Sequence, residues 1–525
     1  MNIYRGMKAA AVLAALSALA SGSAFAQEPT PGGVVRLAGV GEPATFDCAA
    51  LTSSTQLQYI APQYSTLLTF LPDSFPEVSP DLAKEWTVSD DGLRYSFTLN
   101  AGVKFHDGTD LTADDVKATF ERISNPPEGV VSIRKGRFKA LKAIEVSAPD
   151  KIDFVLSEPS SGFLATLAAP WNCVYSAKKL KEDPSYPTKT IMGSGPFVFE
   201  EFVPGASWKA KKFDGYFEKG LPYLDGIDFA IMGSPAVVNA LASGQVDGYM
   251  RLITAPDKKR LEEARGDSVK FDLTPSTSVN MIQVNTARKP LDDVRVRQAL
   301  NLAIDRRVGH TVLGVYAQSG ENVIFREGHA AALTQAEIEK VPGYAPDVAS
   351  NREQAKKLLA DAGVSDLKLT LLAPNIKAPY EPMGIFLIDQ WRQIGVTVTF
   401  DQQPVANQTA RMAAGDFDLS MDFSAPTTDD LTDVLAKWVP GGDGNYSGLK
   451  DDELVALFRK QDTVQDEGER LKIARQFLDR FVQLQYALTT FGTYREVVFD
   501  KKVNGWKNPP SYAVGLDLKT MWMQK

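Results

Sequence analysis

Apolar positions along the chain switch repeatedly between the period of a strand and the period of a helix. The strand-like run Ile227–Met232 precedes a helical pattern at Ala236–Ser243. Further on, strand-like runs at Leu367–Ala373 and Val396–Phe400 flank a helical pattern at Gly384–Gly395. Alternation of strand, helix and strand is typical of α/β organisation.

The first third of the chain carries the period of two that predicts antiparallel strands. Asp90-Asp91-Gly92 marks a turn, after which Tyr95, Phe97 and Leu99 alternate with polar residues. Ile144–Leu156 predicts a hairpin that turns at Asp150-Lys151. Thr112, followed three residues later by an acid, predicts a capping box and a helix through Phe120.

The segment Asn285–Arg307 predicts one amphipathic helix after a strand. Pro290 and Asp292-Asp293 mark the turn and the helix start, because short acidic side chains accept the free amides of a first turn. Apolar residues recur on one face at Val296, Ala299, Leu300, Ala303 and Ile304, and Arg295, Arg297, Asp305 and Arg306 are expected mostly off that face. Arg306 and Arg307 then fall near the C-terminus, where the helix dipole favours positive charge.

In several segments the exact residue identities are more informative than the spacing of apolar positions. Asn285–Arg307 reads NTARKPLDDVRVRQALNLAIDRR, and Val103–Arg122 reads VKFHDGTDLTADDVKATFER. Met192–Phe199 reads MGSGPFVF, and Asn351–Gly363 reads NREQAKKLLADAG. These segments resemble spaced motifs of the extracellular solute-binding proteins of family 5, the peptide/nickel/opine class that serves ABC importers.

This resemblance implies a two-lobed α/β fold of the type II periplasmic-binding-protein kind, with an extra subdomain in the first lobe. The implied first lobe is residues 27–283, including the extra subdomain at about 60–190. The second lobe is 284–488, and residues 489–525 return to the first. Two crossings are expected, near Thr277–Asn285 and Thr489–Tyr494, and a cleft between the lobes.

The N-terminus predicts export. Arg5 and Lys8 precede the apolar run Ala9–Ala20, and Ala24-Phe25-Ala26 follows, which is the order of a cleaved secretory signal peptide at residues 1–26. The run is shorter than the roughly 20 residues that a membrane span needs. We therefore expect a periplasmic protein without a lipid anchor, since no cysteine occupies the predicted cleavage site.

The chain of 525 residues is long enough for two or more domains and carries a formal charge of −8. Removal of Arg5 and Lys8 with the signal peptide makes the remainder more acidic. An acidic chain without a basic block argues against nucleic acid as a partner. We expect a monomer whose partners are a small solute and the membrane permease.

Two cysteines, Cys48 and Cys173, leave two alternatives open. An oxidising compartment permits a disulfide between them. They can equally be two buried thiols that pack as small apolar side chains.

The sequence lacks the motifs of common catalytic sites. It has no G-x-S-x-G elbow, no phosphate-binding loop and no H-E-x-x-H. Its three histidines, His106, His310 and His329, are too far apart for a local metal motif. Solute binding without a cofactor, a metal or catalysis is therefore the expected chemistry.

Candidate ligand-binding residues come from segments that border the cleft in the family. The loop after the first strand contributes Glu42, Thr45 and Phe46, although a plain turn is the simpler interpretation of each. Large aromatic side chains suit an adaptable pocket, although core packing is the simpler role for each. The aromatic candidates and their neighbours are Trp171, Asn172, Tyr249, Thr277, Phe423 and Phe491. Arg326, Lys377 and Arg411 could hold an anionic group or could be surface charges.

One segment departs from the peptide-binding members of the family. They resemble "fDl...gW..D...P...fL", in which the Trp lines the site and the Asp pairs with the α-ammonium group of the peptide. Aligned without gaps from Phe417, this chain places Ser424 at the Trp and Thr427 at the Asp. A neutral hydroxyl cannot give the charge-assisted bond that a buried ammonium needs. Asp429 or Asp430 could substitute, or both could cap the next helix.

The resemblance thus implies the periplasmic solute-binding component of an ABC importer, which closes on its solute and docks on a permease. The solute is expected to be peptide-like, an opine or sugar conjugate, or an aromatic or organic acid, and the missing Asp argues against an ordinary peptide. The alternatives are a secreted hydrolase and a chaperone-like module on the same scaffold.

Overall fold

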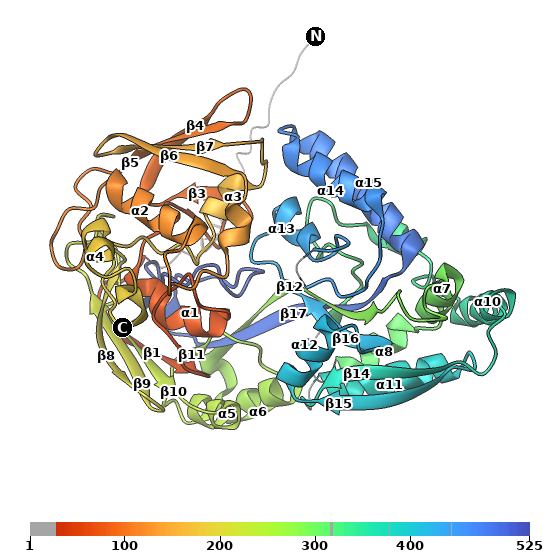
Figure 1. The fold of residues 1–525 in the computed structure, drawn as a ribbon. Helices are drawn as coiled ribbons and strands as arrows, with labels where there is room; N and C mark the ends of the chain where they lie inside the picture. Colours follow the sequence, from red (N-terminus) through yellow and green to blue (C-terminus); the bar gives the residue numbers. More distant parts are fainter. Residues whose placement is uncertain (1–27, 315–318, 377–378, 443) are drawn as a thin grey trace, which may run out of the picture.

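The computed structural model describes residues 28–314, 319–376, 379–442 and 444–525, and in Figure 1 it forms two bodies joined by long strands. The first lobe is the body built from the chain before β12 together with the C-terminal segment. The second lobe lies between the two crossings. The predicted signal peptide and Lys377 lie outside the described residues.

One sheet of eleven strands runs through both lobes. Its order is β15-β14-β16-β12-β17-β11-β1-β10-β9-β8, with β13 paired to β17. The strand bounds are β1 Val34–Gly39, β8 Phe197–Val203, β9 Ser207–Lys212, β10 Gly226–Ile231, β11 Gly248–Tyr249, β12 Val269–Val284, β13 Ser319–Gly320, β14 Lys368–Pro374, β15 Thr397–Gln403, β16 Leu419–Ser424 and β17 Ala487–Asp500. β1 pairs in parallel with β10, and β14 with β15, which confirms the α/β organisation.

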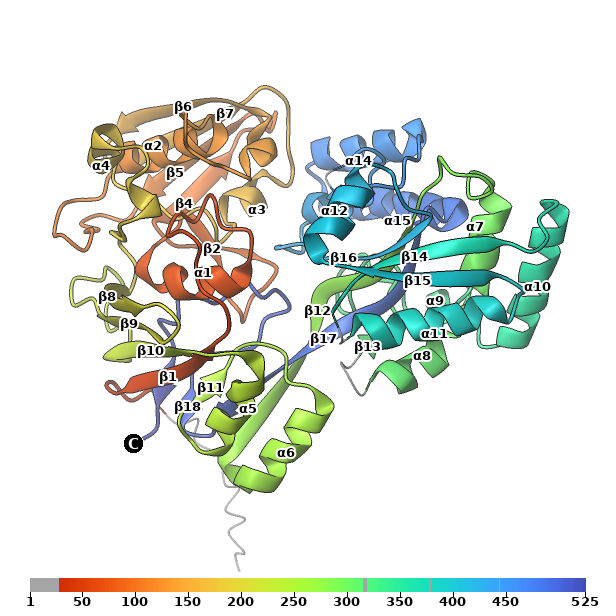
Figure 2. The ribbon, with the colours of Figure 1, turned by 60° about the horizontal axis from the view of Figure 1, so that its bottom comes forward.

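The two predicted crossings are neighbours in a single ladder. β12 and β17 pair antiparallel from Val269–Asp500 to Gln283–Ala487, and they run between the lobes in Figures 1 and 2. The register shifts between Pro275 and Met281, a departure from regular pairing of the kind that bends a strand. The predicted boundaries at residues 283 and 488 fall inside these strands, and the exact division into lobes stays a prediction.

A separate four-stranded antiparallel sheet, β4-β5-β7-β6, packs against helix α2 in the first lobe. Their bounds are α2 Ala113–Ser124, β4 Ala83–Val88, β5 Arg94–Leu99, β6 Leu141–Ala148 and β7 Lys151–Leu156. The predicted capping box is confirmed, because Asp115 accepts the Thr112 amide at 2.7 Å. Phe120 and Phe97 both pack edge-on against Phe154, with ring centroids 5.1 and 5.6 Å away.

The remaining elements complete the two lobes. In the first lobe these are α1 Ser54–Ile60, α3 Phe163–Leu167, α4 Ala177–Glu182, α5 Ser234–Ala242 and α6 Ala255–Arg265, with the short pairs β2 Leu68–Phe70 and β3 Val78–Pro80, and β18 Val503–Asn504 and β19 Trp522–Met523. The second lobe contains α7 Val294–Leu302, α8 Arg306–Leu313, α9 Gln335–Ile338, α10 Val348–Asp361, α11 Tyr380–Arg392, α12 Val405–Ala413, α13 Leu431–Ala436, α14 Asp452–Thr463 and α15 Glu467–Leu484.

The prediction of one continuous helix up to Arg307 is wrong. α7 ends at Leu302, and Asp305 caps the new helix α8 by accepting the Val308 amide at 3.0 Å. Arg306, expected off the apolar face, is buried and donates to the Thr489 carbonyl and to Asn301 Oδ1, both at 2.7 Å. The corner between α7 and α8 is thereby tied to the crossing strand β17.

The two cysteines form a disulfide, which decides between the alternatives that the sequence leaves open. Cys48 and Cys173 are bonded, with Cα atoms 6.1 Å apart and a separation of 125 positions in the chain. The bridge joins the loop after β1 to the segment after α3. Beside it, the buried pair Arg122–Asp47 has a 2.5 Å contact, and the Tyr175 hydroxyl donates to the same carboxylate at 3.0 Å.

Candidate solute-binding site

The loop between β16 and α13, residues 425–430, lies against the crossing strands and is called the crossing loop below. Thr277 Oγ1 of β12 donates to the Pro426 carbonyl of this loop at 2.9 Å. The Thr277 amide donates to Pro510 of the C-terminal segment at 3.2 Å. One residue of the crossing therefore contacts both lobes. The loop contains three predicted site residues: Thr427, Asp429 and Asp430.

Internal contacts occupy the two acidic side chains of this loop. Asp429 is buried and accepts Arg326 Nε at 2.7 Å. Asp430 accepts the Thr432 amide at 2.8 Å, which caps α13, and pairs with Arg470 at 3.1 Å. Capping is thus the role of Asp430, whereas Asp429 and Arg326 neutralise each other. Neither acid presents a free carboxylate, and a ligand role for either stays a prediction.

The positions aligned with the Trp and Asp of peptide-binding relatives offer no charge here. Ser424 is buried and Thr427 is half-buried. The neighbouring aromatic residue, Phe423, is 47% exposed, and its ring centroid lies 5.8 Å from Lys437 Nζ. Unlike the buried candidates Trp171, Tyr249 and Phe491, the predicted ligand-binding residue Phe423 is therefore accessible to solvent.

The loop after β1 makes contacts within the first lobe. Glu42 accepts the Gly205 amide, and Thr45 Oγ1 accepts the Asp47 amide at 3.2 Å. The Phe46 ring packs edge-on against Trp208, with centroids 5.5 Å apart. The Phe46 ring thus packs within the first lobe, and a ligand role for Glu42, Thr45 or Phe46 stays a prediction.

Trp171 and Asn172 are buried next to the disulfide. Asn172 Nδ2 donates to the Thr166 and Leu167 carbonyls at 2.7 and 3.1 Å, which satisfies the end of α3. Arg134 lies over the Trp171 ring, with Cζ 3.9 Å from the centroid. Burial lowers the pKa of Arg134 to about 9. No pattern in the sequence pointed to Arg134.

Three of the other predicted residues lie apart from the crossing loop. Phe491 is buried on β17 among His310 and Phe386, whose ring centroids lie 5.2 and 6.2 Å away. Arg411 pairs with Asp401 at 2.6 Å and with Asp416 at 2.9 Å. Tyr249, on β11, is buried but retains a hydroxyl group without a protein partner among the described residues.

Tyr249 belongs to a cluster whose other members the sequence did not indicate. Arg251 follows it by two residues, and Arg251 Cζ lies 5.3 Å from the ring centroid of Tyr512. Arg495 Cζ lies 4.1 Å from the same ring. Tyr512 is 261 positions after Arg251, so no local motif could have joined them.

The lobes also touch away from the crossing, where α3 meets the second lobe near α13 and α14. The Ser161 amide donates to the Asp462 carbonyl at 2.6 Å, and Ser160 Oγ lies 3.3 Å from the Asp462 carboxylate. Arg137 pairs with Asp433 at 2.6 Å. We call the residues of these three interactions the rim contact: Arg137, Ser160, Ser161, Asp433 and Asp462.

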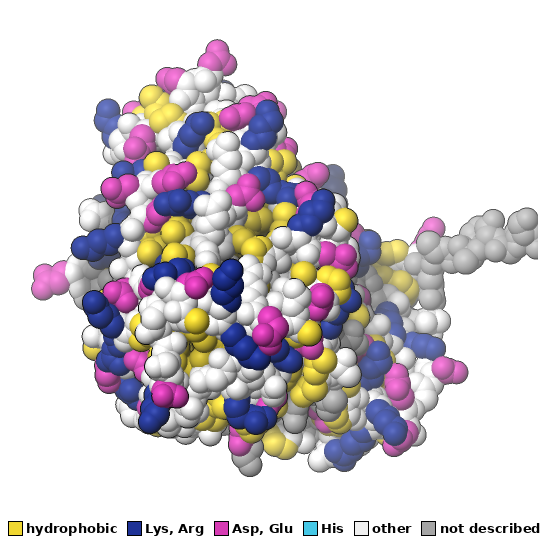
Figure 3. Space-filling model, turned by 90° about the vertical axis from the view of Figure 1, so that its right-hand side faces the viewer, with side chains coloured by type: hydrophobic (Ala, Val, Ile, Leu, Met, Phe, Trp, Pro, Cys, Tyr) yellow, Lys and Arg dark blue, Asp and Glu magenta, His cyan; other side chains and the backbone are white. Residues whose placement is uncertain are grey.

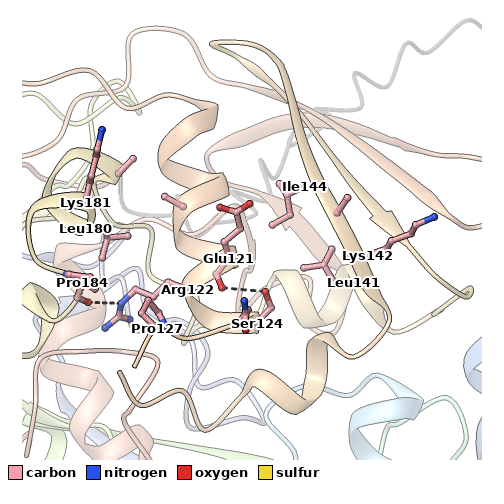
Figure 4. Close-up of a pocket in the computed structure, with 14 residues that line it drawn as sticks. Glu121, Arg122, Ser124, Pro127, Leu141, Lys142, Ile144, Leu180, Lys181 and Pro184 are labelled. Atoms are coloured by element: carbon pink, nitrogen blue, oxygen red, sulfur yellow. Dashed lines mark hydrogen bonds between the residues drawn. The ribbon is translucent and has the colours of Figure 1, made fainter. Parts of the chain in front are cut away.

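A cavity of about 530 Å³ opens between α2, β6 and α4 (Figure 4). Its wall includes Glu121, Leu141 and Leu180. Arg122, which also borders it, is held by the Pro184 carbonyl at 2.8 Å as well as by Asp47. This cavity lies wholly in the first lobe and contains none of the predicted site residues.

The described residues show neither a metal-ligand cluster nor a membrane-spanning helix. No group of three or more His, Cys, Asp or Glu side chains is placed to hold a metal. None of the described helices combines the length and the apolarity of a span. On the face in Figure 3, Lys and Arg alternate with Asp and Glu, unlike the single-sign patch of a nucleic-acid interface.

The fold and the crossing define a class of protein, the two-lobed periplasmic binding proteins. Within that class, residues 77–446 match the model of the bacterial extracellular solute-binding proteins, family 5, and the chain belongs to this family. The family resemblance of the sequence motifs and the predicted fold class are thereby confirmed.

Relatives of this chain differ in the solutes that their names carry. A probable di/tripeptide-binding protein 5 of Pseudomonas aeruginosa is 32% identical over 57% of this chain and 59% of its own length. A glutathione-binding protein of Salmonella typhimurium is 29% identical over 65% of this chain and 64% of its length. The match thus spans less than two thirds of these relatives.

Solved structures match over nearly the whole chain. The binding protein AgaA of A. tumefaciens R10, solved in complex with agropinic acid, is 26% identical. The alignment covers 94% of this chain and 99% of AgaA, with a TM-score of 0.78.

Proposed function

We propose that this chain is the periplasmic solute-binding component of an ABC importer. It binds a small solute between its lobes and delivers it to a membrane permease. Family membership and a fold that matches AgaA over 94% of the chain support this function. The observation that carries it is the paired crossing of β12 and β17, since these two strands join lobes that can move about them.

Closure of the lobes is the mechanism that we propose. A solute can drive closure only through its extra affinity for the closed form. Thr277 joins the two sides at the crossing, and the rim contact joins them at the opposite edge. A solute that contacts both lobes adds to these interactions, and the permease then recognises the closed form. In this scheme the chain works as an exported monomer without catalytic activity.

The proposed solute is an organic acid, such as an opine or sugar conjugate or an aromatic acid, rather than an ordinary peptide. A peptide brings an α-ammonium group that needs a free carboxylate. In the crossing loop, Asp429 is neutralised by Arg326, Asp430 is occupied by α13 and Arg470, and Thr427 is neutral. The relative AgaA, solved with agropinic acid, is consistent with this choice.

Thermal melting of the mature protein against a solute panel tests the function. The panel sets di- and tripeptides and glutathione beside agropinic acid, glycosides, aromatic acids and nickel complexes. A solute at 100 times its Kd should stabilise the protein by about 2.7 kcal/mol. A shift with acids but not with simple peptides is expected. A shift with peptides alone would contradict the solute class, and turnover of a bound solute would favour a hydrolase.

A further inference from the structure

The cluster around Arg251 has the chemistry of an anion site. Arg251 Nη1 donates to Ser54 Oγ at 3.0 Å, and Nη2 donates to the Ser54 carbonyl. Both acceptors are neutral. The guanidinium borders Tyr512, and it lies close enough to Tyr249 for its charge to act on that hydroxyl. A positive charge and three hydroxyl groups are therefore gathered in one place.

We propose that Arg251, with the hydroxyl groups of Tyr249 and Tyr512, binds a carboxylate group of the solute. This site deepens the proposed function and rests on it. Such a site gives the first lobe the group that recognises the acid, while the crossing loop of the second lobe covers the rest of the solute.

In the described part of the chain, this positive charge is not paired with an acidic side chain. Among the residues that the structure describes, no carboxylate lies within ion-pair distance of Arg251 or Arg495. Arg495 is 1% exposed and donates to three carbonyls, those of Pro509, Ser511 and Met250. A buried charge is costly without a partner of opposite sign. Burial lowers the pKa of Arg251 and that of Arg495, the latter to about 9.

Arg251 and Arg495 differ in their access to solvent and therefore in their roles. Arg251 is partly exposed and can reach a solute, whereas Arg495 is enclosed and can act only through its charge. Both guanidinium groups lie near the Tyr512 ring and repel each other, so that Arg251 adds to the burial that lowers the pKa of Arg495. An anion bound at Arg251 relieves that repulsion.

The two tyrosine hydroxyl groups are free to donate. In the described part of the chain, neither the Tyr249 nor the Tyr512 hydroxyl has a protein hydrogen-bond partner, and neither oxygen is among the buried unpaired atoms. Burial raises the pKa of both phenols, so they stay protonated at neutral pH. One accessible guanidinium and neutral donors match the single charge of a carboxylate.

The cluster lies where the lobes meet. Arg495 is a residue of the crossing strand β17, paired with Thr274 of β12. Tyr512 follows Pro510, whose carbonyl accepts the Thr277 amide, and Thr277 also contacts the crossing loop of the second lobe. A carboxylate at Arg251 therefore lies beside the strands about which the lobes move.

The test compares acids with their neutral counterparts in two variants. Phenylacetic acid and agropinic acid are titrated calorimetrically, beside phenylacetamide and the methyl ester of agropinic acid. Losing a hydrogen-bonded charge should weaken acid binding by about 10- to 100-fold in Arg251→Gln. Tyr512→Phe removes one hydroxyl and should weaken it by about 2- to 10-fold. Neutral counterparts should bind wild type weakly and should lose little in either variant.

The matched control is Arg260→Gln, an exposed arginine of α6 bonded to Asn239 in the same lobe. It should bind both acids as wild type does. Equal binding of acids by wild type and by both variants would overturn this site but leave the proposed function standing. If no acid, peptide or neutral solute binds wild type, the function fails and the site with it. If Arg251→Gln does not fold, the acid affinity of Tyr512→Phe still tests the proposed carboxylate site.

Discussion

Arg326 and Asp429 form a buried ion pair next to Thr427, the position that the family resemblance aligns with an ammonium-binding Asp. Each side chain satisfies the other, and the Asp429 carbonyl also lies 2.8 Å from His329 Nε2. A residue engaged in this way contributes to the shape of the loop. A solute could use Asp429 only after displacing Arg326.

Asp429→Asn should therefore destabilise the fold. Breaking a buried pair by removing one partner costs about 3–5 kcal/mol, because the other charge is left unpaired. Urea unfolding of the mature variant measures this loss. Asp73→Asn, which removes an exposed partner of Lys507, is the control and should change stability by less than about 1 kcal/mol. An Asp429→Asn variant of wild-type stability that loses peptide binding would show a ligand role instead.

Asp81 gives a prediction for the pH dependence of stability. Burial raises the pKa of its carboxyl from 3.8 to about 6. Between these values the folded state holds a proton that the unfolded chain has released, so the free energy of unfolding falls as pH rises from about 4 to 6. Asp81→Asn should remove this fall. Urea unfolding at pH 4, 5 and 6 measures it, and parallel curves for the two proteins would contradict the assignment.

Site residues were the hardest part to predict from sequence. Motifs pointed to the crossing loop, and the structure brings Thr277, Thr427 and Asp429 to one region. The sequence did not indicate Arg251 and Tyr512 as neighbours, because the chain between them contains the whole second lobe. An arginine without an acid partner can be recognised only once its surroundings are known.

At the scale of single elements, the spacing of apolar residues predicted where helices and strands lie. It did not predict where a helix is interrupted. The strands and helices of both βαβ units are present, and the Thr112 capping box forms as expected. The sequence did not predict the break between α7 and α8, because apolar residues continue through it. Asp305 looked like a residue of the polar face, yet it accepts the Val308 amide and starts a new helix.

Asp305→Ala should lower the free energy of unfolding by about 1 kcal/mol, the usual cost of losing an N-cap. Thermal melting measures the change. Asp389→Ala removes a half-exposed side chain that pairs with Arg392 within α11, and should stay within about 0.5 kcal/mol of wild type. A loss at Asp389 equal to that at Asp305 would contradict the capping role.

For the whole molecule, the crossing and the rim contact act on the same motion from opposite edges. The backbone of Ser161 and the carboxylate of Asp462 hold α3 against the second lobe, and burial raises the pKa of Asp462. In the proposed mechanism, such contacts favour the closed form before any solute binds. The affinity for a solute then depends on how often the empty protein is closed.

Asp462→Ala should therefore weaken solute binding without touching the solute. If the rim contact contributes about 1 kcal/mol to closure, Kd should rise about fivefold. Calorimetric titration with the solute that shifts melting measures it. Asp452→Ala, an exposed first-turn residue of α14, is the control and should leave Kd unchanged. Unchanged affinity in Asp462→Ala would mean that the rim contact does not govern closure.

The measurement that tests the account most directly is small-angle X-ray scattering of the mature protein with and without a solute selected by melting. Two lobes that close about β12 and β17 should give a smaller radius of gyration and a shorter maximum dimension when the solute is present. Identical scattering curves at a saturating solute concentration would contradict closure between the lobes, even if the solute binds.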